Sequence, residues 1–351
     1  MSSDPHKAKI LYIAPDRSTF VRHDISILSE HYNVLTNFYN WRIKYLTPIY
    51  MLHQMLYLLI QCWSLKAIVV SFGGYWSFFP SLIGKLSGTP VYIILNGTDC
   101  VALPQINYGD LRSPLQRAVI KKSYQWAKML LPVSASLVRT QNSYYGDDPL
   151  KLGYAEVFPK IKTPYKVVAN GLKFDDWHKT GPEEPENNSF ITVLSYGQEI
   201  RKGVPLILDL ARSATDLNFI LVGIDGSGVH DIPANVRCTG RLSVDELRSW
   251  YNRSRFYFQL SIFEGFGVAL CEAMLCECVP IGSNVNAIPE IIGDTGYILN
   301  KRDPVQLEEL VRKAMLHEDL NALGRKARQR ILDHYSLAKR QKELVALTET
   351  V

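Results

Sequence analysis

The chain has 351 residues, of which 47% are hydrophobic and 21% charged, the balance of a soluble globular protein with room for two domains. No short-period repeat or low-complexity tract is present, which excludes a repeat architecture. The formal net charge of +5 is uneven: residues up to 170 include 18 basic and 9 acidic side chains, and the remainder is mildly acidic. We therefore expect the first half to face something anionic, such as a nucleic acid, a phospholipid surface or a phosphorylated substrate.

The N-terminus and the cysteines indicate a reducing compartment. The opening MSSDPHKAKI has no signal-peptide pattern, so we expect a cytoplasmic protein. Cys271, Cys276 and Cys278 form a C-x4-C-x-C cluster, but no histidine or second cysteine pair with zinc spacing lies nearby. Buried structural thiols, and no metal, are expected.

The first half alternates apolar runs with helical patterns. Strands are predicted at 8–15, 32–38, 66–73, 90–97, 128–134 and 165–171. Helices are predicted at about 21–31, 46–65, 76–87, 112–127 and 134–146. Because the strand runs are continuous rather than alternating, both faces of the sheet should be covered, as in a doubly wound parallel sheet.

Two of these helices raise the question of a membrane. Segment 46–65 is the most apolar in the chain, but polar residues interrupt it, so a packed helix is favoured over shallow insertion beside Arg42 and Lys44. Segment 111–128 mixes five basic residues with apolar ones. Either a solvated helix face or a helix on an anionic membrane surface fits this pattern, and the basic first half favours the membrane.

The second half repeats the alternation after a polar segment. Segment 180–189 (TGPEEPENNS) lacks apolar residues and reads as a linker. Strands are predicted at 190–197, 218–223, 236–242, 255–260, 278–283 and 296–299, with helices at 203–214, after the capping box at Ser243, from Pro304, and over 320–350. We therefore predict two doubly wound Rossmann-like domains, at 1–179 and 190–335, facing across a cleft where ligands bind.

The run EGFGVALCE places Glu264 and Glu272 in an apolar segment. Gly265 and Gly267 favour a tight strand-to-helix turn, with the helix beginning near Gly267 or Val268 and Glu272 one turn inside it. Eight residues of helix span ~12 Å, more than the ~5–9.5 Å between paired glycosidase carboxylates. The two acids are therefore expected to hold different parts of one extended ligand.

The intervening helix N-terminus favours a phosphate, and flanking carboxylates favour hydroxyl groups, a combination that suits a nucleotide sugar. A capped helix with two incidental acids is the structural alternative. Three further segments end strands of the same predicted sheet: Arg201-Lys202-Gly203, the loop from Gly223, and Gly240-Arg241. They could line one crevice with the motif.

The run SIFEGFGVALCEAMLCECVPIGSNVNAIPEIIGDTGYIL is similar to the signature of family 4 glycosyltransferases, which are retaining enzymes of the GT-B fold with an E-x7-E motif. Ser134, VVANGLKFDDWH, RKG, LVG and TGRL extend the resemblance over nearly the whole chain. The resemblance implies that Glu264 contacts the donor sugar, Glu272 the ribose, and the backbone of Phe266, Gly267 and Val268 the diphosphate. Lys202 would neutralise the diphosphate, and a helix at 336–351 would cross back to the first domain.

The sequence departs from the family pattern at three places. Asn96 stands where many relatives have a histidine, and an amide carries no proton at neutral pH. The family arginine falls at Gly197 or Gln198, so Arg201 is the substitute. Asp24 lies in a first loop without the usual glycine pair, and either orients an acceptor hydroxyl or serves as a first-turn helix acid. Asp99 is either a turn residue or a cleft ligand.

The predicted function is a metal-independent, retaining hexosyltransferase. It would move a sugar from a nucleotide diphosphate to a glycan or lipid-linked glycan acceptor, in cell-surface polysaccharide synthesis, as a cytoplasmic protein or a peripheral one on the inner membrane face. The alternative is a non-catalytic sugar-nucleotide-binding protein, suggested by Asn96. No nucleic-acid motif is present, and a dehydrogenase is disfavoured because no G-x-G-x-x-G follows the first strand.

Overall fold

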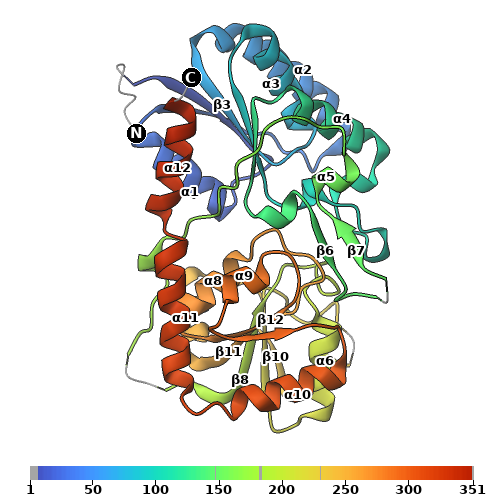
Figure 1. The fold of residues 1–351 in the computed structure, drawn as a ribbon, viewed down its shortest axis with the longest axis vertical. Coiled ribbons are helices and arrows are strands. Elements are labelled where there is room, and N and C mark those ends of the chain that lie inside the picture. Colours follow the sequence, from blue (N-terminus) through green and yellow to red (C-terminus); the bar gives the residue numbers. More distant parts are fainter. Residues whose placement is uncertain (1–6, 147, 182–183, 230, 350–351) are drawn as a thin grey trace. The chain divides into compact units, whose positions relative to one another are not determined.

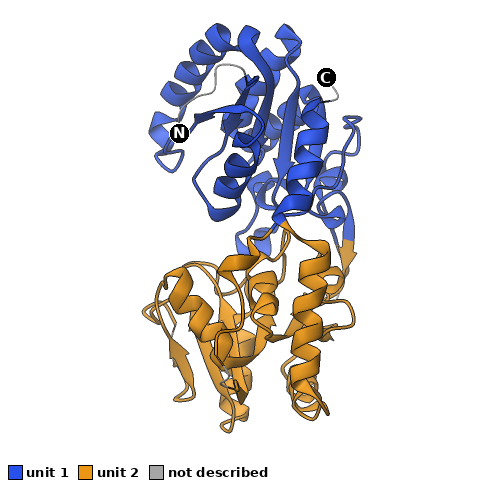
Figure 2. Cartoon of the chain, turned by 90° about the vertical axis from the view of Figure 1, so that its left-hand side faces the viewer, with its two compact units in different colours: residues 1–140, 151–171, 337–351 blue, residues 141–150, 172–336 orange. Residues whose placement is uncertain are grey.

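The computed structural model describes residues 7–146, 148–181, 184–229 and 231–349. The chain forms two compact units, which Figure 2 shows in different colours. Unit 1 comprises residues 1–140, 151–171 and 337–351, and unit 2 comprises 141–150 and 172–336. None of the helices among the described residues is long and apolar enough to cross a membrane.

Unit 1 contains a five-stranded parallel sheet in the order β2-β1-β3-β4-β5 (Figure 1). The strands are β1 (Lys9–Ile13), β2 (Asn33–Asn37), β3 (Leu65–Ser71), β4 (Val91–Leu95) and β5 (Met129–Pro132). The helices are α1 (Thr19–Ser29), α2 (Thr47–Gln61), α3 (Tyr75–Ser87), α4 (Pro114–Trp126), the short α5 (Tyr154–Val157) and α12 (Leu337–Glu349). The strand order reverses between β1 and β3, which makes the sheet doubly wound.

The C-terminal helix α12 belongs to unit 1, where it packs against α1 (Figure 1). Arg340 of α12 donates two hydrogen bonds to Asp24 of α1, Nε to Oδ1 at 2.5 Å and Nη2 to Oδ2 at 2.8 Å. Both side chains are buried, and Tyr12 adds a hydroxyl donor to the carboxylate at 2.9 Å. Arg340 Nη1 also donates to the carbonyls of Val168 and Ala169. The last helix is thus fixed to the first sheet by a fully paired buried charge.

Unit 2 contains a six-stranded parallel sheet in the order β10-β9-β8-β11-β12-β13. The strands are β8 (Glu186–Val193), β9 (Asn218–Val222), β10 (Val236–Cys238), β11 (Ser254–Gln259), β12 (Val279–Ser283) and β13 (Tyr297–Leu299). The helices are α6 (Val204–Ser213), α7 (Val244–Arg253), α8 (Val268–Leu275), α9 (Ile288–Ile292), α10 (Pro304–Met315) and α11 (Leu320–His334). Strands β6 (Thr140–Asn142) and β7 (Leu150–Leu152) form a separate two-stranded sheet.

Two predicted elements are wrong. Segment 134–146 is not a helix: a single turn at Ala135–Leu137 precedes β6, because short polar side chains there bond locally, as in the contact of Tyr144 N with Asn142 Oδ1 at 3.4 Å. Segment 165–171 is not a full strand. It follows β5 with single hydrogen bonds, such as Lys166 N to Leu130 O at 3.0 Å.

The predicted linker at 180–189 also needs correction. The chain instead passes between the units at 140/141, 150/151, 171/172 and 336/337, and β8 already begins at Glu186. The first residues of β8 pair in the sheet, with Glu186 opposite Ser254, while their side chains stay largely exposed. A lack of apolar residues therefore marked an exposed strand end, not a domain boundary. Residues 182–183 of this segment lie outside the described residues.

The buried Asp24–Arg340 pair yields a test of how α12 is held. Asp24→Ala leaves a buried guanidinium without its anion and is expected to lower the free energy of unfolding by about 3–5 kcal/mol. Replacing both partners, as Asp24→Leu with Arg340→Met, should recover most of this loss. Denaturant unfolding measures the change in the free energy of unfolding. The matched control is Asp209→Ala, which breaks an exposed ion pair with Arg212. Equal losses in Asp24→Ala and the control would contradict the assigned role.

Candidate functional site

The strand order of unit 2 reverses between β8 and β11, which are neighbours in the sheet. Chains leaving the carboxyl ends of two such strands diverge and leave a crevice, the usual ligand site of open α/β sheets. Residues 194–203 follow β8, and residues 260–267 follow β11. Arg201, Lys202 and Glu264 lie in these two segments, and the structure brings them together.

Glu264 is the centre of a compact polar cluster. Its Oε2 accepts hydrogen bonds from Lys202 Nζ at 2.7 Å and Gln259 Nε2 at 2.8 Å. Ser261 Oγ at 3.2 Å and Arg201 Nη1 at 3.5 Å complete the contacts of the same oxygen. Among the described residues, Oε1 of Glu264 has no hydrogen-bond partner. One carboxylate oxygen is therefore fixed by four donors, and the other remains available to a ligand.

The cluster keeps Glu264 ionised. Burial alone would raise the pKa of Glu264, but the charges of Lys202 and Arg201, with the hydrogen bonds, outweigh burial and lower this pKa to about 2. Burial lowers the pKa of Lys202, while the charge of Glu264 opposes that shift. The pair is thus a charged one at neutral pH, and Glu264 can accept hydrogen bonds but cannot supply a proton.

Arg201 ties the two segments together through backbone groups. Its Nη1 donates to the carbonyl of Phe263 at 2.8 Å, and its own carbonyl accepts from Ile262 N at 2.8 Å. Nη2 donates to Gln198 Oε1 at 2.5 Å. Arg201 is 8% exposed, so the structure places it as a buried clamp beside the cluster.

Helix α8 begins at Val268, as predicted, with Gly267 at its N-cap. Gly267 has φ +111°, a left-handed value that side chains rarely adopt, which explains the glycine at this turn. Phe266 is buried and packs edge-on against Tyr335, with ring centroids 5.2 Å apart. The first N–H groups of α8 lie at the carboxyl edge of the sheet and are the kind of donors that bind phosphate.

Glu272 lies one turn inside α8 and is only partly exposed. Its carboxyl group has no hydrogen-bond or ion-pair partner within the described ranges. Burial, and then the charge of Asp176, raise the pKa of Glu272 to about 8. In the unliganded protein this carboxyl group is therefore protonated at neutral pH, unlike Glu264.

Two further predicted residues lie at the same edge of the sheet. Gly223 follows β9 with φ +101°, and a Cβ there would come within 1.9 Å of the Leu194 carbonyl oxygen, so its glycine has a structural reason. Arg241 follows β10 and is exposed. Neither contacts the Glu264 cluster in the described structure, and their part in donor binding stays a prediction.

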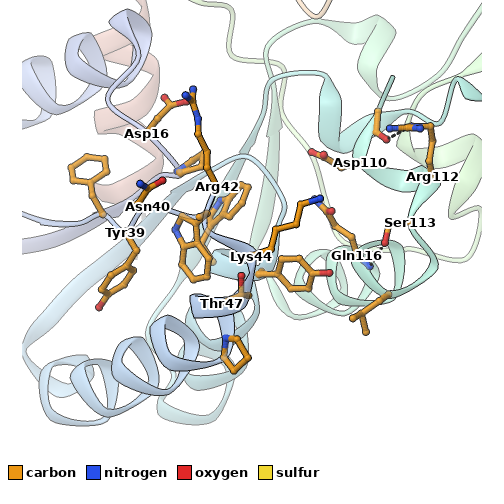
Figure 3. A pocket seen from close by; sticks show the side chains of 18 of the residues that line it. Asp16, Tyr39, Asn40, Arg42, Lys44, Thr47, Asp110, Arg112, Ser113 and Gln116 are labelled. Carbon is orange, nitrogen blue, oxygen red and sulfur yellow. Dashed lines mark hydrogen bonds between the residues drawn. The ribbon is translucent and has the colours of Figure 1, made fainter. Parts of the chain in front are cut away.

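A second hollow lies in unit 1. An open pocket of about 1270 Å³ is formed by segments that follow β1, β2, β3 and β4 and by the start of α4 (Figure 3). Its charged lining residues are Asp16, Arg17, Arg42, Lys44, Asp110 and Arg112. Aromatic side chains, among them Tyr39 and Trp41, form part of the wall.

The family of the C-terminal unit follows from comparison with known proteins. Residues 175–330 match the family model described as "Glycosyl transferases group 1". The match covers less than half of the chain, and over this segment the chain is similar to that family. The resemblance to family 4 glycosyltransferases predicted from the sequence is thereby confirmed.

Relatives of known name match part of the chain. The O-antigen chain mannosyltransferase B of Escherichia coli is 34% identical over 126 residues, which cover 35% of this chain and 32% of that protein. The serotype-specific mannosyltransferase WbdA of Escherichia coli is 28% identical over 138 residues, 38% of this chain and 17% of that protein. The chain thus spans a third or less of the length of these relatives.

Solved structures of glycosyltransferases share the fold over the whole chain. Sucrose-phosphate synthase from Thermosynechococcus elongatus has a TM-score of 0.74 at 12% identity, covering 98% of this chain and 99% of that one. HepE from Anabaena, in complex with UDP, has a TM-score of 0.72 at 13% identity, covering 98% and 100%. The predicted GT-B fold class is confirmed. The cleft between its domains stays a prediction.

Asn96, in unit 1, follows β4 and is partly buried. Its Nδ2 donates to Ser71 Oγ at 3.2 Å and to the Ile94 carbonyl at 3.4 Å, while Oδ1 is buried without a partner among the described residues. An amide with an unsatisfied oxygen can accept one more hydrogen bond. Its place opposite the donor stays a prediction.

The proposed acceptor role of Asp24 is wrong. Asp24 is 1% exposed, and Arg340 and Tyr12 occupy both of its carboxylate oxygens, so it fixes α12 rather than a substrate. Asp99 is likewise interior: its carboxylate accepts from Gly73 N at 2.8 Å and from Tyr124 Oη at 2.9 Å. It shapes the loop after β4 and is not a cleft ligand.

The sequence analysis missed three residues that bear on the site. Gln259 and Ser261 bind Glu264, and their signal was two polar side chains at the end of the apolar strand that precedes the motif. Asp176 was quoted only within the VVANGLKFDDWH stretch, without a role. The negative charge of Asp176 raises the pKa of Glu272. No sequence pattern near Glu272 indicates that the two residues interact. The three cluster cysteines are buried free thiols, as expected.

The raised pKa of Glu272 makes stability depend on pH in a defined window. A glutamate ordinarily titrates near 4.5, whereas Glu272 keeps its proton to about pH 8. Between these values the folded state binds the extra proton, so stability falls as the pH rises through the window. Gln at this position does not titrate. From pH 5 to pH 8, the free energy of unfolding of Glu272→Gln relative to wild type should therefore increase by at least about 1.4 kcal/mol, the equivalent of one pKa unit.

Denaturant unfolding at the two pH values tests this expectation. Glu309→Gln, at an exposed position on α10, is the matched control and should track wild type. A gain of the same size in both variants would contradict the pKa assignment.

Proposed function

We propose that this protein is a retaining glycosyltransferase that transfers a hexose from a nucleotide-diphosphate sugar to a glycan or lipid-linked glycan acceptor. The observation that carries the proposal is the Glu264–Lys202 pair at the strand-order reversal of a group 1 glycosyltransferase domain. Mannose is the first sugar to consider, because two relatives are named mannosyltransferases. UDP is the first nucleotide, because HepE is solved with UDP.

The geometry of Glu264 suits recognition of a sugar hydroxyl. Four donors hold Oε2, and Oε1 is the acceptor left for the ligand. Because the carboxylate stays ionised, its hydrogen bond to a hydroxyl is charge-assisted and strong. The same ion pairing makes Glu264 a poor nucleophile, which argues against a covalent glycosyl-enzyme intermediate.

Lys202 would serve both the glutamate and the diphosphate. An ammonium group has three N–H donors, and Glu264 takes one of them. The remaining donors, the charge of Arg201 and the N-terminus of α8 would offset the charge that develops on the leaving diphosphate. In the proposed reaction the bond from the anomeric carbon to the diphosphate breaks and a bond to the acceptor oxygen forms on the same face. The acceptor proton passes to the leaving diphosphate oxygen.

Glu272 would hold the ribose. Its carboxyl group has no protein partner in the described structure, so a ligand can supply one. A protonated carboxyl group can donate one hydrogen bond and accept another, whereas an ionised one accepts from both ribose hydroxyls.

Single substitutions separate the two glutamates. Glu272→Ala should weaken binding of UDP by about tenfold or more, equivalent to about 1.4 kcal/mol, because the ribose contact is lost. Glu264→Ala should bind UDP with little change but lower kcat about 100-fold or more, because the sugar contact and the charge balance are lost. Calorimetry with UDP and a transfer assay measure the two effects, after a thermal-shift screen against UDP-, GDP- and ADP-sugars has identified the donor. Equal UDP affinity of Glu272→Ala and wild type would count against the ribose assignment.

Asn96→Ala tests whether residue 96 takes part in proton transfer. Asn96→Ala should lower activity without changing the pH dependence of kcat, because an amide only hydrogen-bonds. A new titrating limb in that profile would show that residue 96 takes part in proton transfer.

A purified protein that binds the donor but neither transfers nor hydrolyses it would support the alternative, a non-catalytic sugar-nucleotide-binding protein.

A further inference from the structure

Helix α2 is largely apolar on its outward face as well as on its inward face. Its inward face carries Leu58 and Gln54, which are both fully buried, and Gln54 Nε2 donates to Asn37 Oδ1 at 3.0 Å. Its outward face is apolar, with side chains between 51% and 80% exposed. They are Ile49, Leu52, Leu56, Leu59 and Ile60 of α2, with Tyr45 and Trp63 in the short turns that flank the helix. A surface helix of a soluble protein normally points such side chains inward and its polar ones outward.

The outward residues form one continuous stripe. Apart from the adjacent Leu59 and Ile60, they recur every three or four residues, which at 3.6 residues per turn places them within an arc of roughly 100° opposite Gln54. No residue of α2 is charged, and its exposed His53 is already bonded to Tyr39 Oη at 2.6 Å. Scattered exposed apolar residues are common, whereas a stripe of this length marks a surface that another phase or molecule covers.

The N-terminal end of this stripe meets the pocket of unit 1. Thr47 and Pro48 of α2, with Lys44 just before it, line that pocket (Figure 3). Four cationic and two acidic side chains line it, so the pocket is basic. Arg42 and Lys44 have no ion-pair or hydrogen-bond partner among the residues that the structure describes. Two uncommitted cations thus lie at the edge of the apolar stripe.

We propose that the apolar stripe of α2 and the basic pocket together form a docking surface for an anionic phospholipid bilayer. The stripe would lie in the bilayer interface, and Arg42 and Lys44 would bind lipid phosphate. This inference goes beyond the transfer reaction and does not require a donor to be bound.

The dimensions and composition of α2 favour a bilayer over a protein partner. Its 15 residues are ~22 Å long, too short for a ~30 Å hydrocarbon core, so the helix would lie along the membrane and not cross it. Aliphatic side chains occupy the middle of the stripe and Tyr45 and Trp63 its ends, and aromatic residues with a polar group prefer the membrane interface. The neighbouring unpaired cations match anionic headgroups.

The predicted membrane surface at 111–128 has a different character. Within α4, the exposed positions carry Arg117, Lys121 and Lys122, and Leu115 is the exposed large apolar residue of that described helix. Helix α4 therefore offers charge without a stripe that could be buried. In this proposal α2 supplies the apolar contact, and α4 at most adds attraction.

Co-sedimentation of the full chain with vesicles tests the proposal. Vesicles of phosphatidylglycerol and phosphatidylcholine should bind the protein, and vesicles of phosphatidylcholine alone should bind it much more weakly. Leu52→Ser with Leu56→Ser should lower partitioning at least tenfold, and Arg42→Gln with Lys44→Gln should remove most of the preference for anionic lipid. Val305→Ser with Leu316→Ser, at similarly exposed apolar positions of unit 2, is the control and should bind as wild type.

Three outcomes would overturn the proposal. The first is no binding to anionic vesicles by a protein that still binds its nucleotide, a result that leaves the proposed transferase function intact. The second is binding that survives the α2 changes but is lost in Lys121→Gln with Lys122→Gln, which would move the surface to α4. The third is a dimer in lipid-free solution that the Leu52 and Leu56 changes dissociate, which would assign the stripe to a second copy of the chain. Thermal unfolding of every variant should match wild type.

Discussion

The hydrogen bond between Lys202 and Glu264 joins the two segments on which the proposed donor site depends. Burial at this depth disfavours the charged form of a lysine or a glutamate. Each residue therefore stabilises the charge of the other, and Arg201 and Gln259 fix the pair in place. The partners are 62 positions apart in the sequence, and the chain between them folds as α6, β9, β10, α7 and β11. Because the sheet order reverses there, both segments emerge from neighbouring strands.

The two glutamates of the motif illustrate how one pattern yields opposite protonation states. Both lie in a segment that is largely buried. Glu264 has two cations beside it and is ionised, whereas burial and the negative charge of Asp176 keep the proton on Glu272. A ligand that brings hydroxyl groups to Glu272 would stabilise its ionised form. In the proposed donor site, the sugar end at Glu264 would therefore be charged before the ligand binds, and the nucleotide end at Glu272 would change its protonation on binding.

The sequence allowed prediction of features that depend on local patterns. Continuous apolar runs located most strands, and Gly267 located the start of α8 because a left-handed turn needs that residue. Features that depend on contacts between residues far apart in the sequence could not be predicted. Asp24 looked like a first-turn acid open to a substrate, and only a partner 316 residues away, Arg340, decides otherwise. In the same way, composition marked 180–189 as a linker, although backbone pairing already places Glu186 in a strand.

The uneven charge of the chain fits two different proposed anion sites, one for a diphosphate in unit 2 and one for lipid phosphate in unit 1. In unit 2 the diphosphate would be held by a helix N-terminus and by two cations, one of which Glu264 offsets, so the domain needs little excess of basic residues. In unit 1 the lipid phosphate would be met by exposed cations without internal partners, which add directly to the net charge. Exposed cations such as Arg42 and Lys44 therefore contribute to the excess charge of the first half, whereas the buried pair of unit 2 contributes little to the composition.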